Sequence, residues 1–182
     1  NLSIAQRMGN PEGIERSESS AVGLRVFVTK ADGNVGQANV SSTDISKDAL
    51  LEIAQRGVAM ARLAPADSDS ILAPCELYQQ NIPKLDLLDA DEPTSEWLLE
   101  QCAIAEDSAR NVVGITNSEG ADCSYSRTRV SLAIAGIEGE GFYGSYEGSH
   151  FSTSVSVLAG EGTAMERDYD FTSACHRADL KS

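Results

Sequence analysis

The stretch CSYSRTRVSL, residues 123–132, decides the class of fold, because its residue types are typical of one long β-strand. The glycine-rich segment 136–141 follows it and predicts a break, and Gly160-Glu161-Gly162 predicts a later turn. Three further strands are expected around these glycines, at residues 142–146, 152–158 and 164–172. After Val112 the chain is therefore expected to be β-structure to its end.

Two helices are predicted before these strands. Ser46 can cap the first helix, Asp48 stands in its first turn, and Pro65 ends it. The second helix begins near Thr94, directly after Pro93. Between the helices, residues 64–92 are acidic and contain prolines, and we expect a long surface connection with one helical turn near residues 76–78.

Each helix has apolar residues at helical spacing, which predicts one buried face per helix. In the first helix these residues are Leu50, Leu51, Ala54, Val58 and Ala61. In the second they are Leu98, Cys102, Ala105 and Ala109, and the acidic residues Glu96, Glu100, Glu106 and Asp107 are expected mostly on its other faces.

Four short β-like runs open the chain, separated by turn residues that include Asp32-Gly33. They cover residues 2–5, 13–19, 22–28 and 35–40, and we expect them to form an antiparallel meander. The order is strands, helix, helix, strands. It predicts an α+β fold, with the helices packed on a largely antiparallel sheet, and a single domain over residues 1–182.

The charge balance excludes one class of partner. The 182 residues hold 28 Asp and Glu against 14 Lys and Arg, a net charge of −14, so no basic patch is available for a phosphate backbone. We expect no direct binding of nucleic acid. No apolar run is long enough to cross a bilayer and no signal peptide opens the chain, so we expect a cytoplasmic protein without membrane contact.

Cysteine and histidine spacing suggests no metal site. Cys75, Cys102, Cys123 and Cys175 are dispersed without CxxC and are expected to be buried thiols, and neither His150 nor His176 belongs to an HExxH motif. Cys175 and His176 are neighbours, but adjacent strand residues point to opposite faces and cannot form a catalytic dyad. A hydrolase based on them is therefore the last of the functions considered.

Two further patterns are explained without catalysis. Residues 139–144 fit GxGxxG formally, but β-forming residues follow them and Glu140 would repel a pyrophosphate. Residues 166–170, Glu-Arg-Asp-Tyr-Asp, place three acidic side chains on one strand face, where a cation site is possible and a solvated or chamber-facing surface is preferred. No catalytic constellation follows from these residues.

The order of several motifs resembles the N-terminal domain of the TldD/PmbA family, specifically its PmbA (TldE) branch. Each motif is weak alone, and the resemblance rests on their order along nearly the whole chain. The motifs are residues 15–18 leading into 23–28, residues 38–46, 85–88, 115–121, 141–146 and 165–171.

This resemblance implies a part in an intracellular proteolytic complex that trims peptides, in a family also linked to modulation of DNA gyrase. In the family a TldD-like subunit carries zinc on an HExxxH motif and a later cysteine, whereas the PmbA-like subunit lacks these ligands and helps to enclose the substrate chamber. No catalytic or metal-binding residue can therefore be assigned here, and the chain is expected to be inactive alone, with no cofactor of its own.

The implied partners are a TldD-like subunit or a second copy of the chain, and an unfolded peptide substrate. The alternative function is a stand-alone acidic module that binds a basic protein. Residues of the matched motifs that could face the chamber are Ser42, Thr43, Asp44, Asn117, Glu119, Arg167, Asp168 and Tyr169.

The chain departs from the family pattern at both ends. The helix and strand usual before Asn1 are absent, the C-terminal metalloprotease-like domain is absent, and residues 136–141 replace a shorter turn. We therefore expect part of a longer protein. If residues 2–5 form an unpaired edge strand, they should promote self-association.

Overall fold

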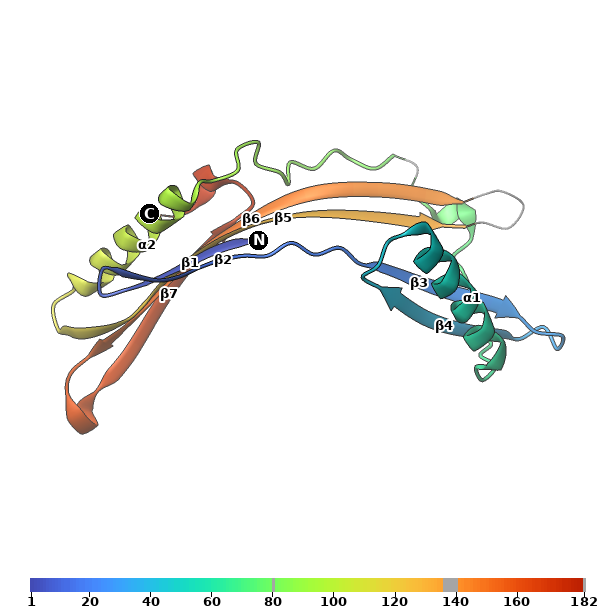
Figure 1. Ribbon diagram of the computed structural model, residues 1–182, viewed down its shortest axis with the longest axis horizontal. Helices are drawn as coiled ribbons and strands as arrows, with labels where there is room; N and C mark the ends of the chain where they lie inside the picture. Colours follow the sequence, from blue (N-terminus) through green and yellow to red (C-terminus); the bar gives the residue numbers. More distant parts are fainter. Residues whose placement is uncertain (80, 136–140, 182) are drawn as a thin grey trace. The chain divides into compact units, whose positions relative to one another are not determined.

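The fold consists of two units, one formed by residues 1–17 with 81–182 and the other by residues 18–80. The computed structural model describes residues 1–79, 81–135 and 141–181 (Figure 1). The second unit is thus an insertion in the sequence of the first. The division into two compact units does not test the expectation of a single domain over residues 1–182, which stays a prediction.

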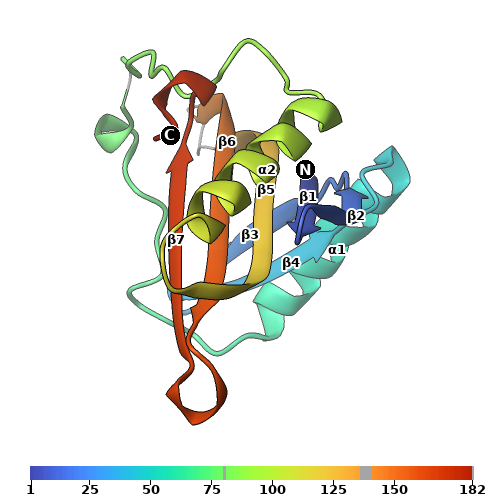
Figure 2. The same ribbon diagram turned by 90° about the vertical axis from the view of Figure 1, so that its left-hand side faces the viewer.

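The first unit is built on an antiparallel sheet with the strand order β2-β1-β5-β6-β7. Helix α2 packs across one face of this sheet (Figure 2). The elements are β1 (Leu2–Arg7), β2 (Asn10–Arg16), α2 (Ser95–Arg110), β5 (Ile115–Ile134), β6 (Phe142–Ala159) and β7 (Glu166–Ala174).

The second unit is a hairpin with a helix on one face. It comprises β3 (Val22–Thr29), β4 (Val35–Ser42), α1 (Lys47–Leu63) and the short 3₁₀ turn η1 (Cys75–Leu77). The turn near residues 76–78 is thus confirmed. Together the two units confirm the α+β class that the sequence predicts.

The predicted meander of the first 42 residues is wrong. β1 and β2 belong to the five-stranded sheet, whereas β3 and β4 form a separate pair. β1 is also no edge strand, because β2 lies on one side of it and β5 on the other, so the expected self-association through residues 2–5 loses its basis. The two strands expected at residues 142–146 and 152–158 are one strand, β6.

Both helices begin at the predicted caps. The Ser46 hydroxyl accepts a bond from the Ala49 amide at 3.4 Å, and the Thr94 hydroxyl accepts one from the Trp97 amide at 3.2 Å. Each bond satisfies an amide that has no partner within the helix. Within the described residues, neither helix is long and apolar enough to cross a membrane.

The buried face of α1 differs from the predicted one. Ile53, Gly57 and Ala61 are buried, whereas Leu50 and Leu51 are exposed. The reason is close packing at Gly57, where an added Cβ would lie 2.8 Å from a Val26 methyl group. The helix backbone therefore rests directly on the hairpin, and the face centred on Gly57 is buried instead of the leucine face.

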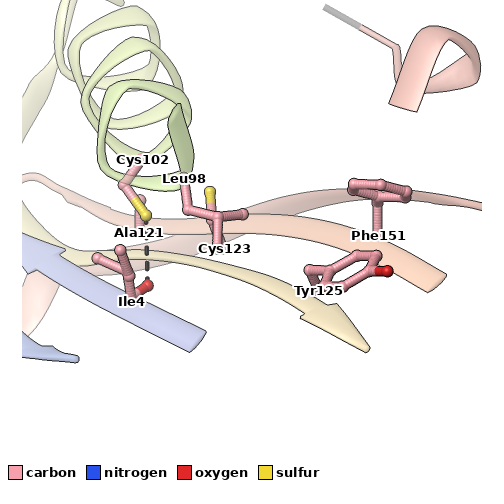
Figure 3. Packing of buried hydrophobic residues seen from close by; sticks show 7 residues of the cluster. All are labelled: Ile4, Leu98, Cys102, Ala121, Cys123, Tyr125 and Phe151. Carbon is pink, nitrogen blue, oxygen red and sulfur yellow. Dashed lines mark hydrogen bonds between the residues drawn. The ribbon is translucent and has the colours of Figure 1, made fainter. Parts of the chain in front are cut away.

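The core of the first unit lies between α2 and the sheet (Figure 3). Cross-strand neighbours Tyr125 and Phe151 place their rings 4.9 Å apart, and Trp97 of α2 meets Phe151 edge-on at 6.2 Å. Cys102 and Cys123 are buried thiols, as expected, whereas Cys75 and Cys175 are only partly buried. The Cys102 thiol donates to the Ile4 carbonyl at 3.3 Å.

Glu106 is the main departure from the predicted helix pattern, because its side chain is fully buried. One carboxylate oxygen accepts the Met8 amide at 2.6 Å, and the other accepts the Gly9 amide at 3.0 Å and the Gln6 side-chain amide at 3.3 Å. Met8 and Gly9 form the β1–β2 turn, both with positive φ, so their amides point to the same acceptor. Glu106 therefore fixes this turn to α2.

Burial raises the pKa of Glu106, but the hydrogen bonds from Ser118, Gly9, Met8 and Gln6 outweigh it, so the pKa lies below its usual value. A lowered folded-state pKa means that the carboxylate stabilises the fold above its unfolded pKa. This contribution is lost as the pH falls through the folded value.

Glu106→Gln is expected to lower the free energy of unfolding by about 1–3 kcal/mol at neutral pH, because its NH₂ group would face a backbone donor. The deficit should shrink as the pH falls and the wild-type carboxylate is protonated. Denaturant unfolding at several pH values measures both effects, with Glu100→Gln on the exposed side of α2 as the control. Equal stability of the two variants at neutral pH would contradict the role of Glu106.

Gly36 offers a test of packing in the second unit. An added Cβ would collide with the carbonyl oxygen of Ala61 and would lie 3.1 Å from Lys30 Cε, whereas a Cβ at Gly23 on the same hairpin meets no atom within 4 Å. Gly36→Ala should therefore lower stability by about 1–3 kcal/mol, and Gly23→Ala should not. Amide hydrogen exchange across residues 22–63 measures the difference; similar exchange in both variants would refute the close approach.

Candidate functional site

The candidate site lies on the sheet face that α2 does not cover. Residues that alternate with the core positions of β5 and β6 point to this face, since side chains alternate along a strand. On β6 these are Ser152, Ser154 and Ser156, all half-buried. No described helix of the first unit packs against this face. The three serine hydroxyls therefore line a surface that no helix of this unit covers.

Three side chains from three strands interact on this face. Arg167 of β7 places its Nε 2.6 Å from the Glu119 carboxylate of β5 and 3.1 Å from the Ser156 hydroxyl of β6. The Ser156 hydroxyl in turn donates to Glu119 at 2.6 Å. Since the Arg167 and Glu119 side chains are 63% and 38% exposed, this Glu119–Ser156–Arg167 cluster remains accessible to a ligand.

An open pocket of about 300 Å³ adjoins the cluster. Its wall includes Glu12, Asp122 and Tyr169 besides the three cluster residues. Desolvation raises the pKa of the Asp122 carboxyl. With three carboxyl groups and one guanidinium, the pocket is suited to polar groups and to basic rather than acidic ones. A larger pocket of about 490 Å³ lies between α2 and β7 and contains none of the predicted site residues.

The structure brings some of the predicted residues together. Glu119, Arg167 and Tyr169 share the pocket, whereas the side chain of Asp168, between the last two on β7, points to the opposite face of the sheet. Asn117 of β5 lines a separate pocket beside the end of α2, and its side-chain oxygen accepts the Ser118 amide at 2.8 Å. Whether these residues face a chamber stays a prediction.

Ser42, Thr43 and Asp44 belong to the second unit and act locally. The Ser42 hydroxyl accepts the Asp44 amide at 3.0 Å, and the Asp44 carboxylate accepts the Ser46 amide at 2.8 Å. The Ser46 hydrogen bonds lower the pKa of Asp44. Ser42 and Asp44 thus shape the entry into α1, while Thr43 is exposed.

Cys175 and His176 have structural neighbours of their own. His176 Nε2 lies 3.1 Å from the Asp86 carbonyl oxygen, and this hydrogen bond, with the charges of Asp86, Asp89 and Asp179, raises the pKa of His176. The Cys175 carbonyl accepts the buried Ser149 hydroxyl at 2.7 Å. These contacts hold the end of β7 to residues 86–89.

Ser149 also accepts the Asp89 amide at 2.7 Å, so its hydroxyl joins two segments that are distant in sequence.

The described residues contain no group of three or more His, Cys, Asp or Glu arranged to hold a metal ion. The GxGxxG match at residues 139–144 lies partly outside the described residues, and strand β6 follows Gly141.

Sequence reasoning missed three members of the site, Ser156, Glu12 and Asp122. The alternating serines of residues 152–156 were a usable signal, because period-two hydroxyls predict a polar strand face. Glu12 and Asp122 had no such signal, because the pairing of β1 with both β2 and β5 brings them together.

Comparison with known proteins finds similarity to one family. Residues 1–61 match the model of PmbA/TldA metallopeptidase domain 1. Over 182 residues, 100% of this chain, the sequence is 29% identical to metalloprotease PmbA of Escherichia coli O157:H7 and covers 38% of it. The first third of the chain thus matches a domain of this family, and the whole chain is similar to part of a PmbA protein.

A second relative is the metalloprotease PmbA homolog of Haemophilus influenzae. It is 29% identical over 177 residues, which are 94% of this chain and 36% of the relative. The chain therefore spans less than two fifths of the length of both relatives. The resemblance to the PmbA branch that the sequence motifs indicate is confirmed.

Two solved structures share the fold. A candidate modulator of DNA gyrase from Bacteroides thetaiotaomicron matches 99% of this chain and 40% of its own with a TM-score of 0.81 at 20% identity. TldE from Thermococcus kodakarensis matches 98% of this chain and 38% of its own with a TM-score of 0.75 at 14% identity. At these identities the likeness concerns the fold.

Arg167→Gln is expected to change the free energy of unfolding by less than about 1 kcal/mol, because an exposed ion pair contributes little to stability. Ser149→Ala should cost about 1–3 kcal/mol, because it leaves the Asp89 amide and Cys175 carbonyl without their partner. Denaturant unfolding of both variants measures this contrast. A large loss for Arg167→Gln would mean that the cluster is structural rather than available for binding.

Proposed function

We propose that the chain is the non-catalytic N-terminal part of a PmbA/TldE-like subunit in an intracellular zinc metallopeptidase complex that processes peptides. In this role its uncovered sheet face helps to enclose the substrate chamber. The partner is a TldD-like subunit, which supplies the zinc site.

The observation that carries this proposal is the polar sheet face around the Glu119–Ser156–Arg167 cluster. Serine hydroxyls and charged groups line it, and no described helix of its unit covers it. An extended peptide presents backbone donors and acceptors at regular intervals, and hydroxyl groups can pair with either. Such a surface binds peptides through their backbone and largely independently of their side chains, as a processing chamber requires.

The described residues are suited to binding a peptide rather than to cleaving it. Zinc sites need several His, Cys, Asp or Glu side chains around one point, and no such group occurs in the described residues. The His176 side chain and the Cys175 backbone carbonyl make contacts at the end of the sheet. This chain would thus bind and orient the peptide, while the TldD-like subunit would provide zinc to polarise the scissile carbonyl.

Arg167 has a specific part in this proposal. Its Nε is held by Glu119 and Ser156, which fixes the guanidinium at the pocket without burying it. A guanidinium in this position can donate to peptide carbonyls, and Arg suits this because its planar group is pre-organised.

The test joins this chain to the C-terminal region of a PmbA relative and combines the product with a TldD-like subunit. We expect zinc-dependent cleavage of an unfolded peptide that neither component shows alone. Arg167→Glu should raise KM about fivefold, the effect of losing about 1 kcal/mol of binding, with little change in kcat. Arg110→Glu, the same charge change on α2, is the matched control and should leave KM unchanged.

Equal activity of the TldD-like subunit with and without this chain would refute the proposal, as would equal KM values for both variants. Salt-sensitive binding to a basic protein, with no affinity for a TldD-like subunit, would instead support the acidic binding module. That alternative draws on the net charge of −14.

A further inference from the structure

Strand β7 forms one edge of the five-stranded sheet (Figure 2). It is nine residues long and pairs with β6 over its whole length, from Glu166 opposite Ala159 to Ala174 opposite Phe151. In an antiparallel edge strand every second residue points its backbone N–H and C=O away from the sheet. Such outward groups are a template for an added strand.

Two side chains of β7 bind amides of the same strand. The Asp168 carboxylate accepts the Tyr169 amide at 2.9 Å, and the Asp170 carboxylate accepts the Phe171 amide at 2.8 Å. Tyr169 and Phe171 are two residues apart, so their amides point to the same side of the strand. Amides directed at these carboxylates belong to the outward set rather than to the ladder with β6.

We propose that Asp168 and Asp170 close the β7 edge to strand addition by occupying the outward amides of Tyr169 and Phe171. A strand that approaches β7 must first displace these two hydrogen bonds, because both amides already have an acceptor. This requirement opposes pairing.

The edge needs this protection because its side chains favour association. Tyr169 is 69% exposed and Phe171 66% exposed, and they lie on one face of the strand. A long, regular edge strand with exposed aromatic side chains is a hazard for aggregation. At the opposite edge β2 contains Pro11, which has no N–H to offer, so each edge carries its own obstacle to pairing.

Asp168 and Asp170 could protect the edge by their charge or by accepting the two amides, and different substitutions separate these effects. If charge alone protects the edge, Asp→Asn should be as harmful as Asp→Ala, because both remove the charge. If the carboxylates act as acceptors, Asn should retain much of the protection, because its side-chain oxygen can still accept the amide. Glu166→Ala is the control for charge, because Glu166 is an exposed acidic residue of the same strand.

The experiment measures amide hydrogen exchange by NMR in the 182-residue chain, corrected for the intrinsic rate of each sequence. Asp168→Ala should speed exchange at Tyr169 about fivefold without affecting Phe171, and Asp170→Ala should do the reverse. The Asn variants and Glu166→Ala should stay close to wild type. Unchanged exchange at both amides in the Ala variants would overturn the inference.

Sedimentation velocity at increasing concentration tests the consequence for association. The double variant Asp168→Ala/Asp170→Ala should form larger species at concentrations where the double Asn variant and Glu166→Ala behave like wild type. Equal association of the double Ala and double Asn variants would assign the protection to charge and refute the capping role. The single variants keep the test decisive if the double Ala variant does not fold.

Discussion

The buried Glu106 carboxylate is the constraint on which the first unit depends. It accepts the amides of both residues of the β1–β2 turn and the side chain of Gln6, and it reaches them from α2. This arrangement sets where β1 lies against the helix, and β1 in turn fixes the register of β5 on its other side. A neutral side chain could not serve three donors at once, so the cost of burying a charge is offset by the contacts it makes.

The sequence predicted the elements more reliably than their assembly. Both helix caps, Ser46 and Thr94, were local signals and were found where expected, because capping depends on residues three apart. The grouping of the first four strands was not predictable, because nothing in residues 2–42 shows that β1 pairs with β5. Glu106 was expected away from the buried face of α2, because helical periodicity cannot show which backbone amides of another segment will contact it.

In the candidate site, too, individual residues were predictable from the sequence and their assembly was not. Glu119, Arg167 and Tyr169 were singled out by family motifs, and the sheet brings them to one pocket. Ser156 joins them only through the pairing of β6 with β5 and β7. The motif residues Ser42 and Asp44 shape the entry into α1, so a match to a family motif marks residues that build the fold as well as residues on an accessible surface.

The position of the second unit within the sequence has a consequence for how the chain folds. β1 must find β5 across more than a hundred residues, with Leu2 opposite Tyr125, whereas β3, β4 and α1 are neighbours in sequence. Contacts between distant residues carry a greater loop-closure cost and slow the search for native pairing. During synthesis on the ribosome, residues 18–80 are complete before β5, the strand that pairs with β1, has been made. During synthesis the first hairpin must therefore remain unpaired on one side until the second half of the chain is made.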